Sequence, residues 1–232
     1  RRLSEEKRHS MSYSRNTENS SENFLKAVYV LQQQVERVST NALADALEIK
    51  APSVTDMARR LENAGYLDYQ KYKGVALTTK GLEVALNLLR RHRLIELYLM
   101  QELGYALHEV HDEAEVLEHH VSERFIEAIA HKLGDPEHDP HGDPIPTAEG
   151  IIVQRDLKPL TVIDLNTIAT VARLKAPGSD MLQHIMERGL ILNATVEVLQ
   201  RDPFDGPVTV LVDGEQRVVG HTVAESVWVE VD

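Results

Sequence analysis

The chain has 232 residues, of which 42% are hydrophobic, and it carries a formal net charge of −12. This length and composition suit one large domain or two to three small ones, and they exclude a disordered protein. No stretch of eighteen or more apolar residues is present, which excludes a membrane-spanning helix, and no signal-peptide pattern is found. The lack of cysteine excludes disulfides and thiolate sites, so we expect a cytoplasmic protein without a membrane partner.

The charge is unevenly distributed along the chain. Residues 1–75 contain 12 Lys and Arg against 10 Asp and Glu, whereas residues 76–232 contain 13 against 27. A mildly basic N-terminal part on an acidic body is typical of a protein whose N-terminal domain alone meets phosphates. Histidine is clustered as well, because eight of the eleven histidines lie between His92 and His141.

The N-terminal part predicts a series of helices. The first 20 residues are polar and rich in Ser, Arg and Glu, so we expect a disordered N-terminal extension there. Apolar residues at helical spacing then predict a helix that begins near Glu22 and is capped by Ser20 or Ser21. A second, short helix follows, and Ala51–Pro52–Ser53 opens a third helix that Gly65 ends.

Two short strands are expected after the third helix, at residues 66–72 and 75–78, joined by a tight turn at Lys73–Gly74. Three helices and a hairpin in this order predict a winged helix-turn-helix domain over residues 21–80, with a small helical domain that does not bind DNA as the alternative. The third helix would enter the major groove by its N-terminal end, and cations of helix and wing would reach phosphates. The residues expected at the DNA are Lys50, Ala51, Pro52, Ser53, Thr55, Asp56, Arg59, Arg60, Lys71 and Lys73.

Two long, leucine-rich helices are expected next. Thr79 caps the first, and the second runs from Val110 to Leu133. Their apolar surface exceeds what a small winged domain can cover, so we expect a homodimer interface in a helical domain over residues 81–142. His92 and Glu96 lie one turn apart on the first helix, which suits either two metal ligands or a surface ion pair.

The stretch Val110–Val121 places two imidazoles and two carboxylates on one helical face. At ~100° per residue, Glu115, Glu118 and His119 lie near ~40°, ~−20° and ~80° from His111. Such nitrogen and oxygen donors suit zinc, iron, manganese or nickel. From this stretch alone, a solvated acidic helix face is the alternative to a metal site.

The C-terminal third changes to loops and strands. Residues 134–150 are rich in proline and without a regular period, and we assign residues 143–160 to a linker. His138 and His141 lie in this loop, and we interpret them as ordinary loop residues because a proline-rich loop holds ligands poorly. Strands are expected at residues 168–174, 196–200, 208–212, 217–219 and 227–231, with one helix at residues 180–187. Together they predict a small SH3-like β-barrel over residues 161–232.

These segments together resemble the diphtheria-toxin-repressor family of metal-dependent transcriptional regulators. The resemblance rests on APSVTDMARRLENAGYLDYQKYKGVALTTKG, RRHRLIELYL, VHDEAEVLEHHVS and DPHGDPIPT, and on a C-terminal part similar to the ferrous-iron-transport A domain. It implies a mainly α fold with small β parts: a winged helix, a helical metal-binding and dimerisation domain, and an SH3-like domain. It also implies a homodimeric repressor, not an enzyme, that binds a divalent metal and then a palindromic double-stranded DNA operator of metal uptake genes.

The resemblance also implies the metal ligands by position. His92, Glu96 and His111 match the ancillary site of the iron-responsive branch. Three further residues and an N-terminal ligand position match the primary regulatory site: Glu115, Glu118, His119 and Asn23. In the family the SH3-like domain supplies glutamate and glutamine ligands as well; these have no clear counterpart here, and the nearest candidates are Asp180, Gln183 or His184.

Glu115 departs from the iron-responsive pattern, and Asn23 is neither the methionine of one branch of the family nor the aspartate of the other. Iron-responsive members usually have cysteine where Glu115 stands, whereas the manganese transport regulators have glutamate there. A hard carboxylate in place of a soft sulfur favours manganese. We therefore expect Mn(II), with Fe(II) as the alternative and Zn, Co, Ni or Cd as substitutes in vitro, and no organic cofactor.

Other classes of protein remain open as alternatives. A winged-helix regulator could sense an organic ligand, with the histidines incidental. A metallohydrolase would leave the winged helix unexplained, and the sequence shows no nucleophile constellation. An interaction module that binds a proline-rich partner is disfavoured, because Phe204 and Trp228 are the only aromatic residues of the SH3-like part.

Overall fold

The computed structural model describes residues 19–176 and 178–231, which divide into two compact units. The first unit contains residues 19–91 and 146–151, and the second contains the remaining described residues. The extension expected at residues 1–20 lies outside the described residues except for residues 19 and 20, which are helical. None of the described helices combines the length and the apolar character needed to span a bilayer.

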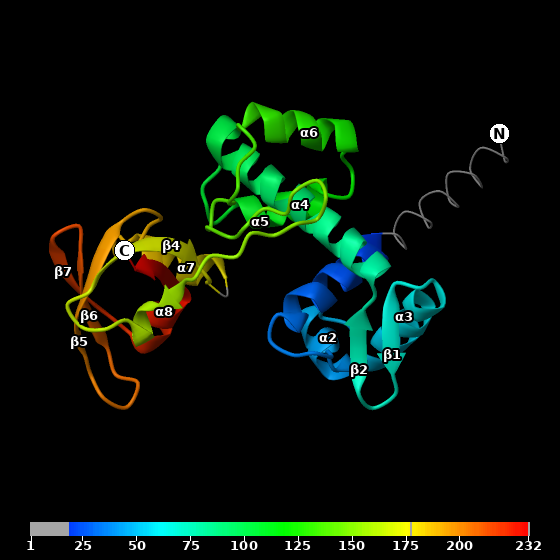
Figure 1. Cartoon of the computed structure of the whole chain (residues 1–232), viewed down its shortest axis with the longest axis horizontal. Helices are drawn as coiled ribbons and strands as arrows, with labels where there is room; N and C mark the ends of the chain where they lie inside the picture. Colours follow the sequence, from blue (N-terminus) through cyan, green and yellow to red (C-terminus); the bar gives the residue numbers. More distant parts are fainter. Residues whose placement is uncertain (1–18, 177, 232) are drawn as a thin grey trace. The chain divides into compact units, whose positions relative to one another are not determined.

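The first unit holds three helices followed by a two-stranded hairpin (Figure 1). The N-terminal helix covers residues 19–32, and the next elements are α2 (Thr40–Ala46), α3 (Ala51–Asn63), β1 (Leu67–Gln70) and β2 (Gly74–Leu77). Their apolar faces meet in one core that includes Phe24, Leu43, Val54 and Val75, each fully buried. The predicted winged helix-turn-helix is therefore confirmed.

Local chemistry explains where these helices begin and end. The Ser39 hydroxyl accepts a hydrogen bond from the Ala42 N–H at 3.1 Å, which caps α2. Pro52 lies in the first turn of α3, where a missing N–H costs nothing. Two details of the prediction are wrong. The N-terminal helix already includes residue 19, so Ser20 and Ser21 are not its cap, and the wing turns at residues 71–73.

The wing is braced by Arg37 and by Gly74. The Arg37 guanidinium lies 2.7 Å from the Asp68 carboxylate and donates to the Gly74 carbonyl at 3.2 Å. The hydrogen bond from Arg37 lowers the pKa of Asp68. Val38 and Val75 exchange two backbone hydrogen bonds of 2.8 and 2.9 Å. Gly74 has φ +99°, and a Cβ there would lie 2.2 Å from the Val38 carbonyl oxygen, so only glycine fits.

Three helices follow the wing: α4 (Thr79–Leu103), α5 (Val110–Leu117) and α6 (Glu123–Lys132). Helix α4 belongs to both units, since the division falls between Arg91 and His92. It is capped by the Thr78 hydroxyl, which accepts from the Gly81 N–H at 3.1 Å, and not by Thr79 as expected. In the second unit, α4, α5 and α6 share a core of buried apolar residues that includes Leu94, Ala114 and Ile126.

The prediction of one helix from Val110 to Leu133 is wrong. The chain leaves helical structure after Leu117 and re-enters it at Glu123. The Ser122 hydroxyl accepts a hydrogen bond from the Phe125 N–H at 3.3 Å and so caps α6. A serine followed by a glutamate is a helix-start signal that competes with continuation, and here it prevails.

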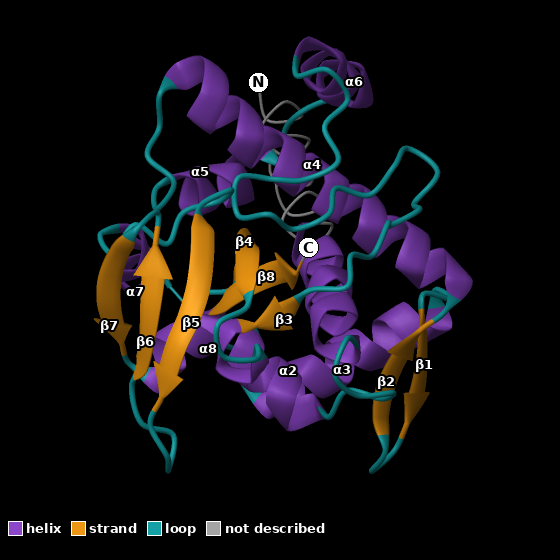
Figure 2. Cartoon of the chain, turned by 60° about the vertical axis from the view of Figure 1, so that its left-hand side comes forward, coloured by secondary structure: helices purple, strands orange, loops and turns teal. Residues whose placement is uncertain are grey.

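The C-terminal part is a six-stranded antiparallel sheet with two helices (Figure 2). The strand order is β3-β8-β4-β5-β6-β7. The elements are β3 (Lys158–Pro159), β4 (Ile168–Leu174), α7 (Ser179–Met186), β5 (Thr195–Arg201), β6 (Val208–Val212), β7 (Glu215–Val219), α8 (His221–Ser226) and β8 (Val227–Val231). The predicted all-β, SH3-like character of this part, its five strands and its helix are confirmed, but the described strands pair in an open row from β3 to β7 and no pairing closes the predicted barrel. Strand β3 and helix α8 were not expected, because each is too short to show a periodic pattern.

Candidate functional site

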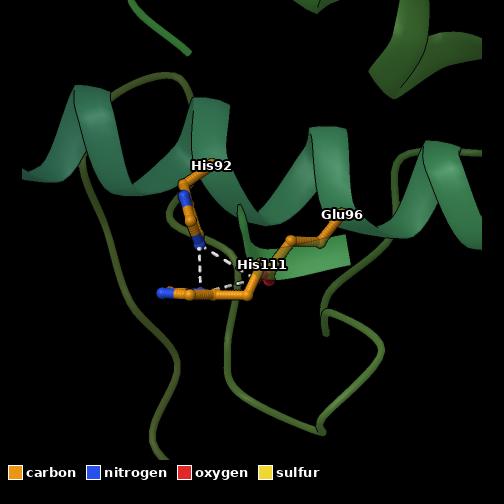
Figure 3. Close-up of side chains that lie close together, drawn as sticks. All are labelled: His92, Glu96 and His111. Carbon is orange, nitrogen blue, oxygen red and sulfur yellow. Dashed lines mark hydrogen bonds and ion pairs between the residues drawn. The ribbon is translucent and has the colours of Figure 1, made fainter. Parts of the chain in front are cut away.

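Three predicted ligands converge where α4 faces the start of α5 (Figure 3). His92 Nε2 lies 2.9 Å from Glu96 Oε1 and 3.1 Å from His111 Nδ1. His111 Nδ1 is in turn 3.2 Å from the same Glu96 oxygen. One ligand atom from each residue lies within 4.8 Å of the other two, so the three side chains could hold one metal ion.

A second group uses the other nitrogen of the same imidazole. His92 Nδ1 lies 2.6 Å from Glu118 Oε2 and 3.9 Å from Glu115 Oε1. These three residues also offer ligand atoms within 4.8 Å of one another. His119 Nε2 lies 3.5 Å from Glu118 Oε1. The structure thus brings together all six ligands that the resemblance places in the helical domain, with His92 common to both groups.

Glu118 keeps its predicted side of the helix although α5 ends at Leu117. It is the C-cap residue of α5 and retains helical angles, φ −56° and ψ −30°. Its position relative to Glu115 is therefore close to that of a continued helix. His119 follows in the turn before α6, with its side chain only 4% exposed.

The centre buries two carboxylates on either side of one imidazole. Glu118, Glu96 and His92 are 0%, 2% and 5% exposed. Burial raises the pKa of Glu96, but hydrogen bonds from His111 and His92 outweigh burial, so this pKa lies well below its ordinary value. Buried carboxylates are costly unless a positive partner compensates them.

The two ring nitrogens of His92 indicate which kind of partner fits the centre. A neutral imidazole has one N–H, so it donates to one carboxylate only. Here both ring nitrogens face a carboxylate oxygen, Glu96 at 2.9 Å and Glu118 at 2.6 Å. Either a second proton or a cation must therefore lie between the ring and one carboxylate. The donor set is imidazole and carboxylate only, since the chain has no cysteine, and it fits a divalent ion such as manganese, iron or zinc.

His141 also lies beside this centre, in a loop whose sequence does not mark its histidines as ligands. Its Nε2 atom is 3.9 Å from Glu96 Oε1, and burial lowers its pKa. The loop that carries it is ordered by Asp139, whose Oδ1 atom accepts backbone hydrogen bonds from His141 and Asp143 at 2.8 and 2.9 Å. Burial and the Asp143 carboxylate raise the pKa of Asp139 to about 8.

Contacts with β4 also hold this loop. The Leu174 N–H donates to the His141 carbonyl at 2.9 Å, and Arg173 Nε lies 3.2 Å from the Asp143 carboxylate. Gly142 has φ +85°, and a Cβ there would lie 2.1 Å from the Ala172 carbonyl oxygen. This loop is therefore held in place by contacts with β4, while the interpretation of His138 and His141 as ordinary loop residues stays a prediction. His138, in contrast, pairs with Pro144 in an isolated β-bridge.

The remaining predicted ligands lie elsewhere in the chain. Asn23 is half-buried on the N-terminal helix, in the first unit. Asp180, Gln183 and His184 lie on α7, and neither of the two metal-type groups found among the described residues contains them. Gln183 donates to Glu187 at 3.1 Å, and His184 Nδ1 lies 3.0 Å from an Arg188 nitrogen.

The predicted DNA-contact residues lie on α3 and on the wing. Lys50 is the N-cap residue of α3, and Ala51, Pro52 and Ser53 form its first turn. Thr55 donates its hydroxyl to the Ala51 carbonyl, whereas Arg60 donates to Ser21 at 2.8 Å and so also supports the unit internally. The exposed residues of the set are Lys50, Pro52, Ser53, Asp56, Arg59, Arg60, Lys71 and Lys73.

Fold and site together define a DNA-binding protein with a winged helix, a helical domain rich in metal-type donors and an SH3-like domain. Comparison with known proteins gives the family. The iron dependent repressor N-terminal DNA binding domain matches residues 16–75, its metal binding and dimerisation domain matches residues 78–147, and the FeoA domain matches residues 158–231.

Individual relatives agree with these matches. The HTH-type transcriptional regulator MntR of Oceanobacillus iheyensis is 36% identical over 110 residues, 47% of this chain and 74% of the relative. The iron-dependent repressor IdeR of Mycobacterium tuberculosis is 29% identical over 222 residues, 90% of this chain and 96% of the relative. A solved manganese-dependent transcriptional repressor in complex with manganese is 37% identical with a TM-score of 0.84, covering 91% of this chain and 99% of that one.

The chain belongs to the iron-dependent repressor family of metal-dependent transcriptional repressors. This membership confirms the resemblance drawn from the sequence motifs. Its relatives include both manganese and iron regulators, so family membership establishes metal-dependent repression but leaves the choice of metal to the ligands of this chain.

Proposed function

We propose that this protein is a cytoplasmic, homodimeric repressor that Mn(II) activates to bind palindromic operators of metal uptake and homeostasis genes. Fe(II) is the alternative activator, and Zn, Co, Ni or Cd are expected to substitute in vitro. The observation that supports this proposal best is the buried row Glu96–His92–Glu118, in which one imidazole lies between two carboxylates. Glu115 favours manganese, because carboxylate oxygen is a harder ligand than the cysteine found in iron-responsive members.

The ligands divide between two sites in this proposal. His92, Glu96 and His111 hold one metal, with His141 close enough to Glu96 to complete that site. Glu115, Glu118 and His119 hold the regulatory metal, with Asn23 as the proposed ligand from the N-terminal helix. We also propose the domain boundaries 21–80, 81–142, 143–160 and 161–232 given above.

A bound divalent cation would place positive charge between the buried carboxylates Glu96 and Glu118. Without it, Glu96 and Glu118 repel each other across His92, and α4 and α5 are held together less firmly. Helix α4 carries His92 and Glu96 near its middle, and its N-terminal part packs into the winged-helix core through Ala85. Ordering α4 is therefore expected to favour a DNA-competent population, which is a coupling between metal and operator.

The dimer is proposed from the helical domain. Val116 on α5 is 63% exposed and Phe125 on α6 is 47% exposed, which is unusual for large apolar side chains on a packed helical pair. A second copy of the chain would cover them, and the family model that matches this region describes a dimerisation domain. Two winged helices then present α3 to two operator half-sites. No organic cofactor and no enzymatic activity are proposed.

The test is operator binding with and without metal. A duplex is enriched from a random library by the protein in anaerobic buffer with Mn(II), and its affinity is measured by fluorescence anisotropy with Mn(II), with Fe(II) and with a chelator. We expect tight binding with Mn(II), weaker binding with Fe(II) and loss of binding with the chelator. Equal affinity with and without the chelator would refute metal activation, and tighter binding with Fe(II) would reverse the choice of metal.

A further inference from the structure

The tip of the wing carries an aromatic side chain in an unusual position. Tyr72 is the middle residue of the turn at residues 71–73 that joins β1 to β2. Its backbone has φ +68°, a left-handed conformation that glycine or asparagine adopts more easily than a bulky residue. The residue is also 93% exposed, so almost none of its ring is covered by the chain itself. Tyr72 therefore costs stability without contributing to the core.

The wing presents this ring rigidly. Arg37 ties β1 to the end of β2 through Asp68 and Gly74, and Val38 pairs with Val75 on the other edge of β2. Gly74 and Val75 are the first residues of β2, so these contacts hold the hairpin directly beside its tip. An exposed aromatic group on a braced, short turn loses little conformational freedom when it contacts a partner.

The charge around the tip indicates what the partner is. Lys71 and Lys73 flank Tyr72 and are both exposed, and Lys71 Nζ lies 4.9 Å from the centre of the tyrosine ring. Two cations separated by one aromatic residue match a polyanion that also offers apolar surface. In DNA the phosphates supply the charge, and the deoxyriboses and base edges that line a groove supply the apolar surface.

We propose that Tyr72 contacts DNA in the minor groove beside the half-site that α3 occupies, with Lys71 and Lys73 on the phosphates of its two walls. This inference rests on the proposed operator binding and adds a contact that the cations alone do not provide. The minor groove is about 6 Å wide, which admits a single side chain but not a helix. A ring in this position responds to groove width, so it contributes to the choice of flanking sequence.

The test compares three variants on the duplex enriched with Mn(II). Tyr72→Gly removes the ring and relieves the backbone, Tyr72→Phe keeps the ring, and Phe204→Gly is the matched control. Phe204 is 99% exposed, has φ +60° and lies in the β5–β6 loop of the SH3-like domain. We expect Tyr72→Gly to weaken operator binding about tenfold, an amount equal to ~1.4 kcal/mol. Tyr72→Phe and Phe204→Gly are expected to stay within about twofold of the wild type.

Two further measurements separate a DNA contact from a folding defect. The melting temperature of Tyr72→Gly is expected to equal or exceed that of the wild type, because the strained backbone is relieved. Hydroxyl-radical footprinting, which reports on deoxyriboses in the minor groove, should show that Tyr72→Gly loses protection next to each half-site and keeps it within the half-site.

Three outcomes would overturn the inference. If the wild type binds the operator with metal and Tyr72→Gly binds it equally well, Tyr72 does not contact DNA and the proposed function remains intact. If Tyr72→Gly binds the operator more weakly but gives the same footprint as the wild type, the minor-groove position is contradicted. A wild type without metal-dependent binding to any enriched duplex would overturn the proposed function and this contact with it.

Discussion

The metal centre and the DNA-contact surface use charge in opposite ways. Glu96 and Glu118 are buried and face one imidazole, so each depends on the protonation and the position of the others. Lys50, Arg59 and Lys73 are exposed on α3 and the wing, where water screens them from one another. Residues of the centre should therefore act as a unit, whereas residues of the DNA surface should act almost independently.

This difference in the use of charge also explains why the metal centre is buried and the DNA-contact residues are exposed. Burying carboxylates close together costs electrostatic free energy. A bound cation offsets this cost, so the buried set can serve as a switch. Exposed cations do not carry this free-energy cost, and they contribute only affinity for phosphates. The comparison predicts large, all-or-none effects in the centre and graded effects on the winged unit.

The largest effect is expected from Glu118→Gln. This change keeps the shape of the side chain but removes the charge next to His92, and Glu118 has no exposure through which water could compensate. We expect Mn(II) affinity to fall by at least about 100-fold. Competition with a fluorescent chelator measures it.

Glu113→Gln is the matched control, because Glu113 also lies on α5 but belongs to neither metal-type group. Its Mn(II) affinity should stay within about twofold of the wild type. Equal losses in the two variants would mean that the acidic surface of α5 attracts metal as a whole, and the assignment of Glu118 would be wrong.

A smaller effect is expected from the backbone of the wing. Gly74→Ala forces a Cβ to within 2.2 Å of the Val38 carbonyl oxygen at φ +99°, and we expect a loss of about 2 kcal/mol in the free energy of unfolding. Gly65→Ala is the control, since Gly65 has φ +80° but no atom within 4 Å of the added Cβ. Its loss should be only about 1 kcal/mol. Urea denaturation measures both, and equal losses would contradict the close approach.

The smallest effect is expected from a single exposed cation. Lys50→Ala removes one charge at the N-terminus of α3, and we expect operator affinity to fall by roughly tenfold or less, with the salt slope reduced by about one. Mn(II) affinity should not change. Lys158→Ala is the control, because it removes an exposed lysine of β3 and should leave the salt slope unaltered. If Lys50→Ala also leaves the salt slope unaltered, Lys50 does not contact DNA.

Much of the winged unit could be predicted because its signals are local. The Ser39 cap, the proline at the start of α3 and Gly65 at its end each act within a few residues, and the structure retains all three. The same local rules misplaced the wing turn, since nothing in residues 66–78 shows that Val38 pairs with Val75. That long-range pairing fixes where the strands begin and end.

The centre could be predicted only in part, for the same reason. The spacing of His92 and Glu96 on one helix, and of Glu115 and Glu118 on the other, indicated the donors. Only the packing of α4 against α5 brings His92 close to Glu115 and Glu118 as well as to Glu96. His141 was missed because its loop is ordered by the buried Asp139 and by contacts with β4, about 30 residues away in the sequence.

We expect metal binding and operator binding to be coupled through the chain, and the most direct measurement of this coupling is its reciprocity. Thermodynamic linkage requires that the factor by which Mn(II) raises operator affinity equals the factor by which the operator raises Mn(II) affinity. Titrating metal into the free protein and into its complex with the enriched duplex measures the second factor. We expect Mn(II) to bind more tightly in the complex by that same factor; identical Mn(II) affinity with and without the duplex would contradict the coupling.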